Sequence, residues 1–135
     1  MFTYFDIAGI ERDPFDMQKS SKHVAVLFDG SAIVSVGTNS YRKHAEEVVL
    51  EKYYAAGKRN RSLKMYIIRL GKNKLSRPCK DCCALLRRHP NIRVFYSDSD
   101  GRWIEEINFD STHCARRRFE FYENRRQCCK SCSSC

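Results

Sequence analysis

Four side chains in two short segments could do chemistry together: His44 and Glu46 in HAE, and Cys79 and Cys82 in PCKDC. One imidazole and two thiols are ligands that zinc prefers, and three protein ligands leave a fourth position for water, as in catalytic zinc sites. Cys79 and Cys82 lie one turn apart at a predicted helix start, where thiolate is favoured. Glu46 follows His44 closely enough to move a proton of that water without binding the metal. The two segments therefore predict one catalytic zinc ion.

The elements that must position these residues alternate between strand and helix. We expect the following order: a short helix over 13–20, strands over 23–28 and 31–37 around the turn Asp29-Gly30, a helix over 39–57, a strand over 63–70, a helix over 78–89, and strands over 92–97 and 102–109. This order predicts an α/β fold, a three-layer α/β/α sandwich with a mixed five-stranded sheet. Because only a short turn joins the last two strands, the fifth must run antiparallel to the fourth.

Local patterns refine this prediction. Asn39 or Ser40 can cap the helix after the hairpin, and Gly57 can end it. That helix carries an apolar stripe which we expect to be buried: Ala45, Val48, Val49, Tyr53 and Ala56. The strand over 92–97 is apolar on both faces, which indicates an interior position in the sheet. We expect the apolar residues of the fifth strand to share one side of it: Trp103, Ile107 and Phe109.

The two segments together form the H-x-E…P-C-x-x-C signature of zinc-dependent nucleobase deaminases. Over about residues 14–101, the chain resembles the cytidine and deoxycytidylate deaminase superfamily, through KSSKHVAVLFDGSAIVSVGTN, HAEEVVL, SRPCKDC and IRVFYSDSDG. The resemblance implies a cytidine-deaminase-like fold with one zinc ion. It implies these site residues: His44, Cys79 and Cys82 for zinc, Glu46 as the proton shuttle, Asn39 for the sugar and the Ala45 backbone for the base.

The activity that the resemblance implies is hydrolytic deamination of a cytosine nucleotide or nucleoside. Water attacks the ring carbon that carries the amino group, and ammonia leaves. A His ligand such as His44 is typical of deoxycytidylate, tRNA-adenosine and polynucleotide deaminases, whereas the short link to the fifth strand is typical of a different branch. Two alternatives stay open: a deaminase or binding module for single-stranded nucleic acid, and a structural component, for instance of a virion or capsid, that reuses the fold.

The charge of the chain is unevenly distributed. Its 135 residues carry a formal net charge of +9. Residues 42–93 hold fifteen basic and four acidic side chains, whereas 94–112 hold one basic and five acidic. The basic stretch over 58–80 lies between the two halves of the zinc motif in sequence. It is either a solvated face or a surface for anions, and it favours a nucleotide substrate or nucleic acid as a partner.

Eight cysteines raise the question of redox environment. The opening segment MFTYFDIAGIERDPF has neither a basic start nor a long apolar run, and no stretch approaches the roughly 18 apolar residues of a membrane span. We therefore expect no transmembrane segment and an intracellular protein, cytoplasmic or virion-associated and not secreted, whose thiols are reduced. Like many relatives, it would form a homo-oligomer or join a larger assembly.

Four of the cysteines crowd into the last eight residues: Cys128, Cys129, Cys132 and Cys135. This tail would bind a second metal, accept acyl chains beside a basic patch, form disulfides in an assembly, or be a flexible end. We divide the chain into an irregular N-terminal arm (1–12), a deaminase-like domain (13–112), a basic C-terminal helix (113–127) and the Cys-rich tail (128–135). Packing roles are expected for the remaining candidates: His23, Cys83, His89, Trp103, Phe109 and Cys114.

Overall fold

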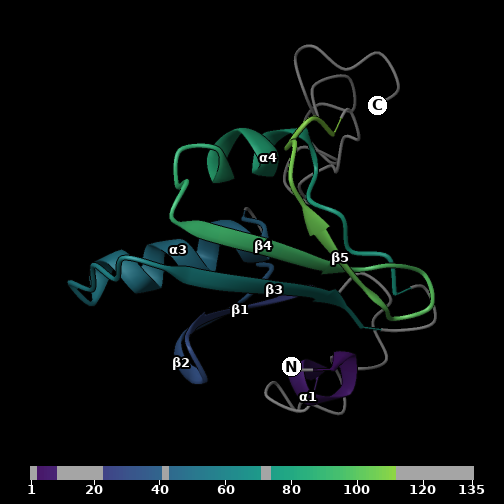
Figure 1. The fold of residues 1–135 in the computed structure, drawn as a ribbon, viewed down its shortest axis with the longest axis horizontal. Helices are drawn as coiled ribbons and strands as arrows, with labels where there is room; N and C mark the ends of the chain where they lie inside the picture. The colour runs from purple at the N-terminus through teal and green to yellow at the C-terminus, as the bar shows by residue number, and fades with distance from the viewer. Residues whose placement is uncertain (1–2, 9–22, 41–42, 71–73, 112–135) are drawn as a thin grey trace.

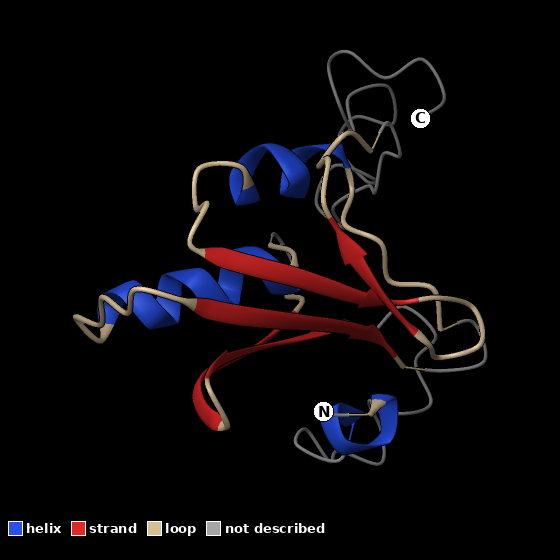
Figure 2. Ribbon diagram, viewed as in Figure 1, coloured by secondary structure: helices blue, strands red, loops and turns tan. Residues whose placement is uncertain are grey.

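The computed structural model describes residues 3–8, 23–40, 43–70 and 74–111. In these residues a five-stranded sheet of order β2-β1-β3-β4-β5 lies between two helices on one face and one on the other (Figure 1, Figure 2). The elements are α1 (Tyr4–Ala8), β1 (His23–Asp29), β2 (Ala32–Thr38), α3 (Ala45–Ala55), β3 (Leu63–Arg69), α4 (Lys80–Leu86), β4 (Ile92–Ser97) and β5 (Trp103–Glu106). This arrangement confirms the predicted α/β sandwich and is consistent with a cytidine-deaminase-like fold.

The strand directions decide where the helices begin. β1 runs antiparallel to both β2 and β3, β3 runs parallel to β4, and β5 runs antiparallel to β4 as predicted. It follows that β2, β3 and β4 point the same way and end at one end of the sheet, at Thr38, Arg69 and Ser97. We call this the carboxyl end, and we call the opposite end, where the same strands begin, the amino end. Since α3 follows β2 and α4 follows β3, both helices start at the carboxyl end.

Two apolar layers hold the sandwich together. Side chains of α3 and α4 pack on one face of the sheet, and the short α1 packs on the other. Successive strand residues point to opposite faces, which is why neighbours such as Met65 and Tyr66 enter different layers. In the first layer Val49 and Tyr53 of α3 are fully buried with Leu86 of α4. This layer fixes the two helices that carry the metal motif against the same sheet.

Gly37 allows α3 to lie close against β2. A Cβ atom at this position would come within 2.5 Å of the Val49 backbone nitrogen and 3.0 Å of the Ala45 carbonyl oxygen. Ser35, two residues earlier, donates a hydrogen bond from its hydroxyl to the Val49 carbonyl at 2.8 Å. The first turns of α3 are therefore held on β2 by close backbone contact.

The predicted irregular arm over 1–12 is wrong for residues 4–8, which form α1. The signal in the sequence is a capping box: the Thr3 amide donates to Asp6 Oδ2 at 2.8 Å, and the Asp6 amide donates to Thr3 Oγ1 at 3.2 Å. These bonds lower the pKa of the Asp6 carboxyl. Ile7 of this helix is fully buried against the sheet, so its short apolar face is anchored.

The start of α3 also differs from the prediction. Its N-cap is His44, not Asn39 or Ser40, and the Glu47 carboxylate accepts a hydrogen bond from the His44 amide at 3.4 Å. Gly57 follows the helix with a φ of 73°, as expected for a residue that ends it. The buried stripe is shifted by part of a turn: Val48 is half-buried and Ala56 exposed, whereas Glu46 and Leu50 are buried.

β5 is shorter than predicted and does not carry its apolar residues on one side. Trp103 packs in the layer of α1, Phe109 packs in the layer of α3 and α4, and Ile107 is 72% exposed. The strand ends at Glu106, and Phe109 has a φ of 52°, so the alternation of a strand does not continue to it. The predicted helices over 13–20 and 113–127, the Cys-rich tail and Cys114 lie outside the described residues.

Candidate metal centre

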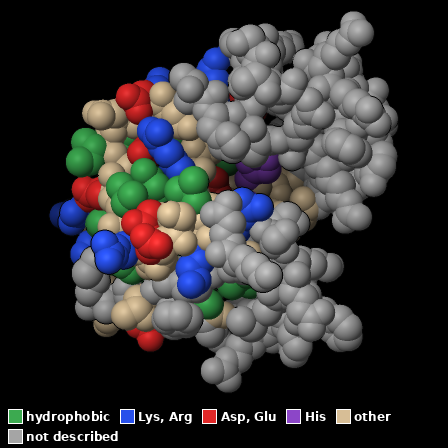
Figure 3. Space-filling model, turned by 90° about the vertical axis from the view of Figure 1, so that its right-hand side faces the viewer, with side chains coloured by type: hydrophobic (Ala, Val, Ile, Leu, Met, Phe, Trp, Pro, Cys, Tyr) green, Lys and Arg blue, Asp and Glu red, His purple; other side chains and the backbone are tan. Residues whose placement is uncertain are grey.

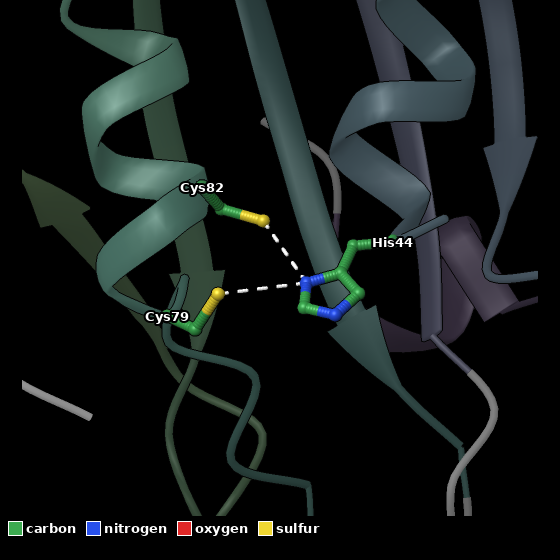
Figure 4. A group of neighbouring side chains, drawn as sticks. All are labelled: His44, Cys79 and Cys82. Carbon is green, nitrogen blue, oxygen red and sulfur yellow. Dashed lines mark hydrogen bonds between the residues drawn. The ribbon is translucent and has the colours of Figure 1, made fainter. Parts of the chain in front are cut away.

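The three predicted zinc ligands meet at the carboxyl end of the sheet. His44 immediately precedes α3, Cys79 immediately precedes α4, and Cys82 lies on the first turn of α4 (Figure 4). His44 Nδ1 is 3.2 Å from Cys82 Sγ and 3.5 Å from Cys79 Sγ, and the three ligand atoms all lie within 4.8 Å of one another. Residues that lie far apart in the chain thus form one potential metal site.

The distances fit a tetrahedral zinc ion. Bonds of about 2.0–2.1 Å to nitrogen and about 2.3 Å to sulfur, at tetrahedral angles, place a nitrogen and a sulfur ligand about 3.5 Å apart. The two Nδ1–Sγ distances, 3.2 and 3.5 Å, are close to this value. A set of one nitrogen and two sulfur atoms also suits zinc better than a hard cation. The group could therefore hold a metal ion, and its donors are those of a zinc site.

The two thiols lie in an environment that favours ionisation at Cys79. Cys79 and Cys82 are 4% and 1% exposed. The hydrogen bond from Cys82, and then those with His44, lower the pKa of Cys79 to about 3. The hydrogen bond with Cys79 and burial raise the pKa of Cys82. A bound divalent cation would favour the thiolate form of both side chains.

Glu46 lies beside the three ligands but does not belong to their group. It is only 5% exposed, although it is the second residue of a helix. Burial raises the pKa of its carboxyl, and a hydrogen bond with Cys82 opposes this rise in part. The structure thus places Glu46, the predicted proton shuttle, at the metal centre.

Cys83 is buried and does not belong to the ligand group, which fits the packing role expected for it. Its thiol is buried and lies 3.5 Å from Glu106 Oε1, and burial raises its pKa to about 11. Glu106 is itself 6% exposed and forms an ion pair at 3.3 Å with Arg77, which also contacts Asp110 at 3.1 Å. This network joins the end of β5 to the residues that precede Cys79. The sequence does not indicate this network, because Glu106 stands in a segment that carries a net negative charge and resembles a solvated surface.

The two predicted substrate contacts are not part of the ligand group. Asn39 Oδ1 accepts a hydrogen bond from the His23 amide at 2.9 Å, and the Asn39 amide donates to the His23 carbonyl at 3.3 Å. Asn39 therefore ties the end of the hairpin together at the carboxyl end of the sheet. Ala45 is fully buried at the start of α3, with its carbonyl against Gly37. Their roles toward a substrate stay predictions.

The basic stretch over 58–80 is divided between the two ends of the sheet. Lys58, Arg59 and Arg61 lie in the connection from α3 to β3 at the amino end. Arg69 ends β3 and Lys74 follows it, so these two lie at the carboxyl end with the metal centre. Figure 3, which views the molecule from the right-hand side of Figure 1, shows Lys and Arg side chains dispersed among acidic and apolar ones. The basic stretch as a whole therefore does not lie at the metal centre, and only its later part does.

Comparison with known proteins identifies no family for the chain. No protein-family model matches the chain, and no significant relative is found among curated proteins. Among the described helices, none is long and apolar enough to cross a membrane.

Proposed function

We propose that the protein is a zinc-dependent hydrolytic deaminase that acts on a free cytosine nucleotide or nucleoside. The position of buried Glu46 beside His44, Cys79 and Cys82 is the observation that carries this proposal. A structural zinc site uses four protein ligands, whereas a catalytic site uses three and keeps one position open. Among the described residues the ligand group has three members. The additional carboxyl is the group that a hydrolytic reaction needs for proton transfer.

The chain's own residues account for the proton movements of such a reaction. His44 Nδ1 and the sulfur atoms of Cys79 and Cys82 would hold the zinc ion, which when bound supplies a Lewis acid that makes water nucleophilic near neutral pH. Glu46 would carry one proton of the attacking water to the ring nitrogen beside the reacting carbon, and then the second proton, from the hydroxyl so formed, to the departing amino group. A bond from oxygen to the ring carbon forms, the bond from that carbon to the amino nitrogen breaks, and ammonia and the uracil product leave.

A nucleotide is the preferred substrate in this proposal. Arg69 and Lys74 lie at the same end of the sheet as the metal centre. Cations near a site raise the local concentration of anionic substrates and attract a phosphate group. The substrate would therefore be a cytidine or deoxycytidine monophosphate in preference to the uncharged nucleoside.

The test is a substrate panel on purified, zinc-loaded protein. Ammonia and the uracil product would be measured with CMP, dCMP, cytidine, deoxycytidine and a cytosine-containing single-stranded oligonucleotide, and zinc would be measured per chain. We expect one zinc and turnover of a monophosphate. Turnover of the oligonucleotide alone would favour the nucleic-acid alternative, and bound zinc without turnover of any substrate would favour the structural one.

Variants separate the roles of the residues. Glu46→Gln should keep zinc and lose activity by at least about 100-fold, because a general acid–base group contributes about 10²–10⁴ to the rate. Cys79→Ser and His44→Ala should lose zinc as well as activity. Glu51→Gln is a matched control, since Glu51 is exposed on the same helix and pairs with Lys43. Full activity of Glu46→Gln would reject the proposed mechanism.

A further inference from the structure

Two turns that are distant in sequence form one surface at the amino end of the sheet. They are residues 56–62, between α3 and β3, and residues 87–91, between α4 and β4 (Figure 1). The Leu63 amide donates to the Asn91 carbonyl at 3.0 Å, and Asn91 Nδ2 donates to the Asn60 carbonyl at 3.2 Å. We call these two turns the amino-end surface. Their mutual hydrogen bonds fix the position of one turn relative to the other.

The amino-end surface is strongly basic. It exposes five cationic side chains and contains no acidic residue: Lys58, Arg59, Arg61, Arg87 and Arg88. None of the ion pairs found among the described residues includes any of these five. The nearby Asp29 accepts a hydrogen bond from the Asn60 side chain at 2.6 Å. The five cations therefore create a positive potential that an anionic partner would relieve.

Among the described residues, three of these cations contact neutral groups that do not compensate their charge. Lys58 Nζ donates to the Val34 carbonyl at 3.0 Å, and Arg87 donates to the Phe109 carbonyl. The Arg59 guanidinium lies over the Tyr54 ring, 4.8 Å from its centroid. A preorganised cation loses less conformational entropy when it binds an anion than a freely moving one.

The neighbourhood of Tyr54 favours nucleic acid over other polyanions. The Tyr54 ring lies 5.4 Å from the His89 ring between centroids, and its hydroxyl is 2.8 Å from His89 Nδ1. Surfaces that bind single strands combine cations that contact phosphates with aromatic and arginine planes on which bases stack. The amino-end surface and the neighbouring Tyr54 of α3 together contain both kinds of group. We propose that the amino-end surface binds the phosphodiester chain of single-stranded nucleic acid.

This surface is separate from the metal centre. α3 starts beside the centre and ends at the amino-end surface, and its 11 residues span about 16 Å. One nucleotide cannot contact both places, so the proposal does not depend on the deaminase activity. A variant of the surface that still deaminates free nucleotides would separate the two proposals.

The test measures binding of fluorescein-labelled dT15 and rU15 to the full chain by anisotropy, between 50 and 200 mM salt. For single strands, each phosphate contact contributes about 0.7 to the slope of log K against log salt. Arg61→Ala/Arg88→Ala should make this slope less negative by about 1.4 and weaken binding about 25-fold at 100 mM salt. Comparing the two probes shows whether DNA or RNA is preferred.

A matched control removes the same charge elsewhere. Lys43→Ala/Arg102→Ala replaces two exposed cations outside the amino-end surface and should leave the slope nearly unchanged. Thermal unfolding would verify that both variants fold. An equal loss in both variants, no binding of either probe, or preferential binding of a duplex or of polyglutamate would each overturn the proposal.

Discussion

Ser76 and Ser97 share a hydrogen bond of 2.8 Å between their side-chain oxygens, and both residues are buried. The Ser76 amide donates to the Ser97 carbonyl at 2.9 Å, and the Ser97 amide donates to Ser76 Oγ at 2.9 Å. Ser76 Oγ also donates to the Ile67 carbonyl at 2.7 Å. The pairing of β3 with β4 ends at Ile67 and Tyr96, so Ser76 bridges the strands where they separate. It thereby anchors the loop that delivers Cys79 to the metal centre.

Ser76→Ala should destabilise the fold and weaken metal binding together. The change removes the hydroxyl that satisfies two buried backbone groups, which should cost about 1–3 kcal/mol in the free energy of unfolding. Because Cys79 lies three residues further along the chain, zinc affinity should fall as well. Urea denaturation and zinc competition with a chromophoric chelator measure the two effects.

The control for Ser76→Ala is Ser62→Ala, at an exposed position in the connection to β3. It should change neither quantity by more than about 0.5 kcal/mol, as is usual for surface substitutions. Wild-type zinc affinity in a destabilised Ser76→Ala would show that Ser76 supports the fold without positioning Cys79.

Gly37→Ala should be more damaging than Gly30→Ala. The added Cβ at Gly37 would meet backbone atoms of α3 at 2.5 Å and 2.9 Å, and backbone cannot rotate away as a flexible side chain can. We expect a loss of about 1–3 kcal/mol, typical of overpacking. The helix should shift outward and move His44 relative to the two cysteines, so zinc affinity should also fall.

Gly30 provides the comparison because a Cβ there would meet nothing within 4 Å, although its φ of 61° is in the left-handed region. Gly30→Ala should therefore lower the free energy of unfolding only by the cost of a Cβ atom in the left-handed conformation, about 1–2 kcal/mol. Its zinc affinity should be unchanged. Denaturation and zinc titration of both variants test this order. Equal zinc affinities in the two variants would contradict the role assigned to Gly37.

The elements that place the metal motif could be predicted from sequence because their signals are local. Asp29-Gly30 specified the hairpin, Gly57 marked the end of a helix, and the short link after Ser97 required an antiparallel fifth strand. The ligand set could be predicted because the spacing of Cys79 and Cys82 is itself a chemical pattern. In the structure, His44 lies beside Cys79 and Cys82, as the motif requires.

The remaining features depend on contacts that no local pattern encodes. The sequence does not show that Ser76 fills the gap between two separating strands, or that Glu106 is buried against Cys83. The spatial distribution of the charges could not be predicted for a related reason. Residues of the same basic stretch, such as Arg61 and Arg69, lie at opposite ends of β3, and only the tertiary fold separates them.

Removal of zinc should lower thermal stability. A ligand that binds only the folded state stabilises it by about 2.7 kcal/mol when its free concentration is 100 times its Kd. An excess of EDTA should therefore lower the Tm of zinc-loaded protein by several degrees, and added zinc should restore it. Cys82→Ser, which removes one ligand, should show a much smaller shift. An unchanged Tm after complete removal of zinc would indicate that the group does not bind metal in the folded protein.

His89 should make the protein less stable as the pH falls. Burial and, to a smaller extent, the neighbouring Arg88 lower the pKa of His89 in the folded state. The unfolded chain, with a His pKa of about 6.5, then binds the proton more readily, so stability is lost as the pH falls below about 6.5. His89 Nδ1 and the Tyr54 hydroxyl are 2.8 Å apart, and the Arg59 guanidinium lies over the Tyr54 ring, so a charge on His89 would also be felt by these neighbours.

The comparison that isolates this effect is His89→Gln, whose side chain keeps an acceptor but does not titrate. The free energy of unfolding of both proteins would be measured by urea denaturation between pH 5 and 8. The wild type should lose more stability than the variant between about pH 7 and 5, and the two curves should run parallel above pH 7. The other histidines are present in both proteins and cancel in the difference. Parallel curves across the whole range would mean that His89 titrates alike in the folded and unfolded chains, and that its contact with Tyr54 does not depend on charge.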